Sequence, residues 1–71
     1  MENIKIKTPF IKLDAFLKFA GEAGTGGEAK AYILEGKVLV NGEACTMRGK
    51  KLYPGDTVSI AGRIFSVVQG E

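Results

Sequence analysis

Residues 13–42, LDAFLKFAGEAGTGGEAKAYILEGKVLVNG, contain the succession of helix, turn and strand signals that decides the fold. At the start of this stretch, apolar residues recur at intervals of three and four, which is the period of one helix face. Those residues are Leu13, Phe16, Leu17 and Ala20. Gly21 then ends the pattern, because glycine readily adopts the left-handed conformation that closes a helix. The sequence therefore predicts a short amphipathic helix with one buried stripe.

Phe19 lies on the flank of that stripe. An aromatic residue in this position is expected to be a half-buried part of the core. The alternative is a platform on which a nucleobase stacks. The helical pattern favours the first interpretation.

A second helix is predicted after a glycine-rich turn. Thr25 and Glu28 have the spacing of a capping box, in which the hydroxyl accepts from the third amide and the carboxylate accepts from the cap amide. Gly26 and Gly27 put no side chain over the first free amides, so a phosphate could approach them closely. The alternative is that these residues only make a good helix start. A P-loop is not indicated, because it needs Gly-Lys-Ser/Thr after a strand. The buried stripe consists of Ala29, Tyr32 and Ile33, and Gly36 ends the helix.

Strands are predicted on both sides of the helical pair. Asn41-Gly42 is a strong hairpin signal between residues 38–40 and 43–46. Alternating segments also predict strands at residues 4–7, 57–60 and 64–68, and we expect residues 69–71 to fray. The chain thus predicts an α+β fold, in which two short crossing helices pack on a small, mostly antiparallel sheet.

Residues 47–51, MRGKK, form the densest positive segment of the chain. Arg48, Lys50 and Lys51 fall within four residues, and no acid is nearer than Glu43 and Asp56. A charged loop of this kind is commonly just solvated. A basic cluster beside a hairpin is also typical of a surface that contacts phosphates.

Composition excludes some classes of protein but does not identify the function. The 71 residues suit one domain, residues 1–71. Ten Lys and Arg against eight Asp and Glu give a net charge of +2, so a nucleic-acid function depends on where the basic residues lie. No apolar run approaches the ~20 residues that span a bilayer, and no signal-peptide core is present. Cys45 is the single cysteine, which argues against a disulfide-stabilised secreted domain. We therefore expect a cytoplasmic monomer that binds no membrane, cofactor or metal.

The order and spacing of many of these residues resemble the ribosomal-protein-S-four RNA-binding domain, the αL motif. The matching residues are Leu13-Asp14, Leu17, Gly21, Thr25, Ala29, Ile33, Gly36, Val38, Val40, Asn41-Gly42 and Gly55-Asp56. The match covers about residues 11–60, and the short chain is similar to the stand-alone bacterial YbcJ/YaaA group of that family.

This resemblance implies a non-catalytic protein that binds structured RNA, such as ribosomal RNA or tRNA, and that works with the ribosome or its assembly factors. It implies phosphate contacts from the helical pair, the turn between the helices and the following hairpin. Carried over by position, the contact residues are Lys18, Thr25, Gly26, Gly27, Lys30, Asn41, Arg48, Lys50 and Lys51. The chain departs from the family at Thr25-Gly26, where many members have Ser-Arg. The loss of that arginine removes a strong phosphate contact. Phosphate binding would then depend more on the backbone amides of Gly26 and Gly27 and on residues 48–51.

Other classes of function remain as alternatives. A β-grasp sulfur carrier would need a C-terminal Gly-Gly, whereas this chain ends Gln69-Gly70-Glu71 and places two helices before its first hairpin. An enzyme is disfavoured because the chain has no histidine and its cysteine and serines lack a base of the usual kind. A protein-interaction module in ribosome assembly is not separable from RNA binding by sequence.

Overall fold

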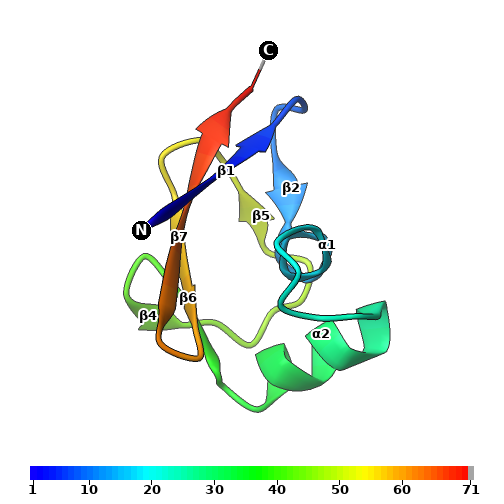
Figure 1. Ribbon diagram of the computed structural model, residues 1–71. Coiled ribbons are helices and arrows are strands. Elements are labelled where there is room, and N and C mark those ends of the chain that lie inside the picture. Colours follow the sequence, from blue (N-terminus) through cyan, green and yellow to red (C-terminus); the bar gives the residue numbers. More distant parts are fainter. Residues whose placement is uncertain (71) are drawn as a thin grey trace.

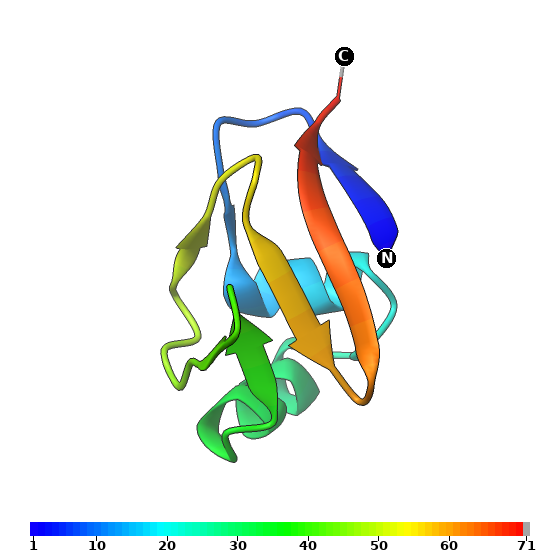
Figure 2. The ribbon, with the colours of Figure 1, turned by 90° about the vertical axis from the view of Figure 1, so that its left-hand side faces the viewer.

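The computed structural model describes residues 1–70 as a sheet with two helices packed on one of its faces (Figures 1 and 2). The elements are β1 (Glu2–Ile6), β2 (Ile11–Lys12), α1 (Leu13–Phe19), α2 (Gly26–Leu34), β3 (Val38–Val40), β4 (Glu43–Ala44), β5 (Lys51–Leu52), β6 (Thr57–Ile60) and β7 (Arg63–Gln69). The main sheet has the order β1-β7-β6-β3-β4, and β2 and β5 form a separate two-stranded ladder. The predicted α+β class is therefore confirmed.

The sheet is mostly antiparallel, as predicted, with one exception at its edge. β1 runs parallel to β7, whereas β3, β4, β6 and β7 pair antiparallel. The predicted fraying of residues 69–71 is wrong for residues 69 and 70, because the Gly70 amide and the Gln69 side chain both donate to the carbonyl of Ile6. Glu71 lies outside the described residues. The returning strand predicted at residues 43–46 ends at Ala44.

Both predicted helix stripes face the core. Leu13, Phe16 and Leu17 are fully buried in α1, and Ala29 and Ile33 are fully buried in α2. The ring of Phe16 meets that of Phe65 from β7 at 6.0 Å in an edge-to-face arrangement, which is favourable beyond area burial alone. This contact ties the helical layer to the sheet and fixes the position of α1.

Phe19 is a correction to the sequence prediction. Its side chain is 63% exposed, so it is not a half-buried part of the core. The stripe of α1 is already complete without it, because Phe19 is the last residue of that helix and points away from the packed face.

The Asn41-Gly42 turn has the backbone that its sequence predicts, and the Ala61-Gly62 turn has a similar one. Asn41 and Gly42 have φ of 52° and 86°, and Ala61 and Gly62 have φ of 53° and 79°. Two successive positive φ values match the right-handed twist of the flanking strands, and Asn-Gly adopts them readily. In the described residues, neither helix combines the length and the apolar character needed to cross a bilayer.

Candidate nucleic-acid interface

The basic loop, residues 45–50 between β4 and β5, is fixed against the start of α1. The amides of Leu13 and Asp14 donate to the carbonyls of Lys50 and Arg48, at 2.9 and 3.1 Å. These amides belong to the first turn of the helix and have no partner within it, so the loop supplies what the helix lacks. The backbone of the loop is therefore held in one place while the side chains of Arg48 and Lys50 are exposed.

Lys51, expected in the same loop, lies instead in β5. Its strand pairs with β2, which puts Lys51 directly opposite Lys12 in an antiparallel ladder. The Lys51 ammonium lies 4.8 Å from the centroid of the Phe10 ring, within cation–π range. Like charges opposite each other destabilise such a pair, so this arrangement concentrates positive charge at a cost in stability.

Lys12 is a candidate contact residue that the sequence did not reveal. It belongs to a two-residue strand, which is too short for an alternating pattern to indicate. It is also the residue that precedes α1, so it lies beside the loop carbonyls that receive the helix amides. We add Lys12 to the basic group of Arg48, Lys50 and Lys51, and we call these four residues the cationic cluster.

The start of α2 is the second candidate contact segment. The Glu28 amide donates to the Thr25 hydroxyl at 3.1 Å, as the capping box predicts. The Glu28 carboxylate, however, accepts from the amide of Gly24 at 3.2 Å and not from that of Thr25. It also accepts from the Tyr32 hydroxyl, and its charge raises the pKa of that phenol.

Gly26 and Gly27 leave open space where other residues would carry a side chain. A Cβ on Gly26 would meet no atom within 4 Å, and one on Gly27 would meet only the Thr25 hydroxyl at 3.9 Å. Neither residue carries a side chain that could hinder an anion, and the positive end of the α2 dipole favours negative charge at this helix start. The nearby Glu28 carboxylate opposes that attraction.

Both candidate segments are connected to α1. The basic loop contacts its first turn, whereas residues 20–25 lead from its last turn to the start of α2. In Figure 2 this connection runs back beneath α1 before α2 begins. Lys18 on α1 and Lys30 on α2 are exposed.

Asn41 has a different position from the other predicted contacts. Its side-chain oxygen accepts from the amide of Thr57 at 2.9 Å, and its side-chain nitrogen donates to Asp56 at 3.2 Å. Asp56 in turn accepts from the amide of Tyr53 at 2.8 Å. The Asn-Gly and Gly-Asp signals of the sequence are thus joined in one network that links two turns. Most of the hydrogen-bonding capacity of Asn41 is used inside the protein.

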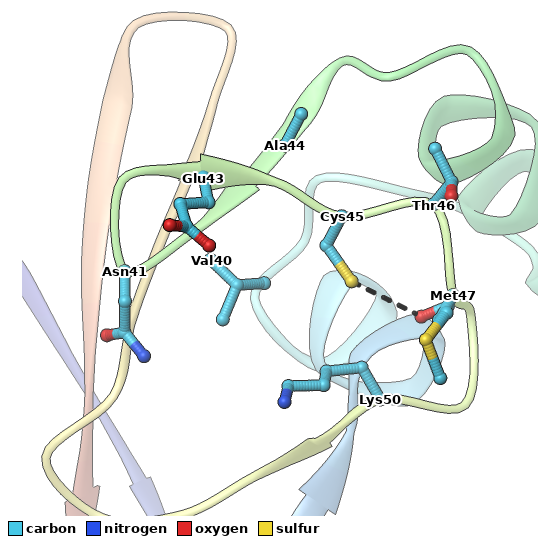
Figure 3. A pocket seen from close by; sticks show the side chains of 8 residues that line it. All are labelled: Val40, Asn41, Glu43, Ala44, Cys45, Thr46, Met47 and Lys50. Atoms are coloured by element: carbon cyan, nitrogen blue, oxygen red, sulfur yellow. Dashed lines mark hydrogen bonds between the residues drawn. The ribbon is translucent and has the colours of Figure 1, made fainter.

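A hollow of about 490 Å³ separates the hairpin from the basic loop (Figure 3). Lys50 extends its side chain into the hollow from the loop, while Val40 and Asn41 lie across from it on the hairpin. Cys45 is half-buried, and its Sγ lies 3.8 Å from the carbonyl oxygen of Met47.

Arg63 shows how charges are arranged elsewhere in the molecule. Its Nε donates to Glu2 at 3.0 Å and its Nη1 donates to Glu22 at 2.6 Å. These hydrogen bonds, the one to Glu2 first, raise the pKa of the guanidinium. Lys37 is likewise paired with Glu35 at 3.0 Å. In the described residues, no member of the cationic cluster forms a salt bridge.

A family model for the S4 domain matches residues 4–68. The chain belongs to the S4 domain family. This assignment agrees with the residues that predicted the resemblance, and it extends the S4 match to β1 and β7, outside residues 11–60.

Two similar proteins span most of the chain. A Bacillus subtilis (strain 168) protein described as "Probable ribosome maturation protein RlbA" is 49% identical over 59 residues, which cover 83% of each chain. YbcJ of Escherichia coli (strain K12) is 40% identical over 62 residues, which cover 87% of this chain and 89% of YbcJ.

A solution structure of YbcJ from E. coli matches this S4 domain with a TM-score of 0.72 and 38% identity. The match covers 96% of this chain and 87% of that one. That structure is described as revealing an αL motif involved in RNA-binding. The predicted membership of the YbcJ-like group is confirmed.

Proposed function

We propose that this S4 domain protein binds structured RNA through phosphate contacts along α1. The observation that carries the proposal is the cationic cluster, whose four side chains are exposed, lack acidic partners in the described residues and sit on a backbone fixed by α1. The RNA-binding described for YbcJ and the name of RlbA support the same function. The role is binding, without catalysis by the domain.

Shape recognition suits a surface of this size. A-form RNA has a major groove too narrow for side chains, so a small protein reads the phosphate spacing and the wide minor groove. The cluster holds phosphates beside the first turn of α1, and the amides of Gly26 and Gly27 hold another at the start of α2. Thr25 fixes the conformation of that turn. Lys18 and Lys30 add exposed charge beside it.

We expect the cluster to supply most of the binding energy. Where many S4 domains carry an arginine after the cap residue, this chain has Gly26, and Glu28 adds a negative charge nearby. The amides therefore contribute less than the loop does. With a net charge of +2, non-specific attraction is weak, and the target must fit the surface.

The target we propose is ribosomal RNA or a tRNA-like RNA, bound by a cytoplasmic monomer consisting of one domain, residues 1–71. The name of the B. subtilis relative favours a role in ribosome maturation. A second candidate function, docking to a ribosome assembly protein, is favoured by the same name. The two differ in what the cationic cluster contacts.

The test is ultraviolet crosslinking in cells, followed by sequencing of the attached RNA. Wild-type protein is expected to recover structured ribosomal or transfer RNA, and reversal of charge at Arg48, Lys50 and Lys51 is expected to abolish that recovery. Recovery of protein partners without RNA would overturn the proposal in favour of the docking module. Purified wild-type and variant proteins with equal thermal melting temperatures provide the control for folding.

A further inference from the structure

Phe19 lines a groove that the phosphate contacts do not use. The groove encloses about 360 Å³ between the last turn of α1 and the stretch that runs from the end of β1 to the start of β2. Its lining residues are Lys5, Ile6, Lys7, Thr8, Ile11 and Phe19. Ile6 is buried and Ile11 half-buried, so the floor is apolar, while Lys5 and Lys7 are exposed at the rim.

The exposure of Phe19 is not required by the fold. Leu13, Phe16 and Leu17 already fill the core side of α1, and a polar residue at position 19 would leave that packing intact. An exposed aromatic side chain beside an apolar floor marks a surface that becomes covered by a partner. The chemistry of the rim indicates which partner.

We propose that this groove receives one unpaired nucleobase of the bound RNA, stacked on the ring of Phe19. A base is flanked by two phosphates, and the rim offers two lysines for them, Lys5 near the end of β1 and Lys7 just beyond it. None of the lining residues is acidic, which complements a polyanion and not a mixed protein surface. A base within a duplex has both faces covered, so the groove selects an unpaired one. This inference rests on the proposed function and names a further feature of the same RNA.

The groove is expected to accept any base. Its one hydroxyl, that of Thr8, donates to the carbonyl of Phe10 at 2.7 Å and is therefore not free to donate to a base edge. Stacking on an aromatic ring with lysines nearby is tolerant of sequence, since every base has a π face. Phe19 directly follows Lys18 in the last turn of α1, so the groove lies at the same end of that helix as this predicted phosphate contact.

The chain has no tryptophan, so Phe19→Trp introduces a single fluorescent reporter in the groove. The probes are a synthetic RNA hairpin with a short oligouridine overhang and the same hairpin with a blunt end. We expect the overhang hairpin to quench the tryptophan and the blunt one to leave it unquenched. Equal quenching by both, or none by either while both bind, would overturn the stacking.

The second measurement is the affinity of Phe19→Ala for both hairpins. Its preference for the overhang is expected to fall about 5- to 150-fold relative to wild type. Leu34→Ala is the matched control, because Leu34 is the last residue of α2, is 58% exposed and does not line the groove. It should keep the wild-type preference. An unchanged preference in Phe19→Ala would refute the groove while leaving the phosphate surface intact. Failure of wild type to bind either hairpin would instead count against the phosphate surface, and with it the stacking.

Discussion

Arg63 and the cationic cluster show two opposite uses of charge in one small domain. Arg63 joins Glu2 of β1 to Glu22 of the connection between the helices, so its charge is neutralised where it lies. Lys12 and Lys51 are held opposite each other with no acid partner in the described residues. Folding alone favours the first arrangement and disfavours the second. We propose that the paired charges serve the structure and that the cluster serves a partner.

The largest expected effect comes from reversing the cluster. The variant Arg48→Glu, Lys50→Glu, Lys51→Glu should lose at least about 100-fold in RNA affinity, because three phosphate contacts become repulsions. Its melting temperature should change little, since these side chains are exposed and the loop is held through its backbone. Fluorescence anisotropy with a labelled structured RNA measures the affinity.

Lys37→Glu and Lys50→Glu provide the matched control for that experiment, because each changes the net charge by two units. Lys37 is paired with Glu35, so its reversal should affect RNA binding much less than that of Lys50. Equal losses in the two variants would show that only the net charge matters, and the comparison would fail.

Asn41→Ala tests whether the hydrogen-bonded network serves the structure. Removing its side chain leaves the Thr57 amide without its partner and puts alanine at a φ of 52°, so stability should fall by about 1–3 kcal/mol. Chemical denaturation measures this loss. Asn3→Ala, at an exposed position of β1, should be nearly neutral. A loss of RNA affinity without loss of stability would instead restore Asn41 to the contact surface.

Gly26→Ala combined with Gly27→Ala should change stability and binding in opposite directions. The structure leaves room for both methyl groups, and alanine is a better helix former by up to about 1 kcal/mol per residue. The same methyl groups keep a phosphate away from the amides, so RNA affinity should fall several-fold. Unchanged affinity would show that these amides are not contacts. Thermal melting and anisotropy together distinguish the outcomes.

The smallest effect is expected from Arg63→Gln. The guanidinium and its two glutamates lie at the surface, where ion pairs contribute little and are screened by salt. The melting temperature should fall slightly at low salt and less at high salt, and RNA affinity should stay the same. A marked fall in affinity would place Arg63 in the interface.

Local patterns in the sequence predicted the parts of the fold that depend on local physics. The helical period of Leu13 to Ala20 and the Asn41-Gly42 turn were both confirmed. The β2–β5 ladder was missed because two residues carry no periodicity, and the parallel β1–β7 pair depends on contacts across the whole chain.

The candidate site was predictable to a similar extent. The basic loop was visible as a run of charge, but its anchoring to α1 depends on backbone contacts that no side-chain pattern encodes. Lys12 joins the cluster only through strand pairing. Phe19 was predicted to be half-buried but is exposed. The burial of a residue at the edge of a helix stripe depends on which other elements pack against it, and the helical pattern does not contain that information.

The central claim is that the unpaired cations of the cluster contact phosphates, whereas the paired cations do not. The most direct test is the slope of log affinity against log salt for wild type and two matched double variants, each lacking one arginine and one lysine. For about four phosphate contacts, wild-type affinity should fall roughly 50- to 150-fold between 50 and 200 mM salt. Arg48→Gln with Lys50→Gln should make the slope shallower by about 1.4 to 1.8, and Lys37→Gln with Arg63→Gln should leave it unchanged. Equal slopes in the two double variants would contradict the claim.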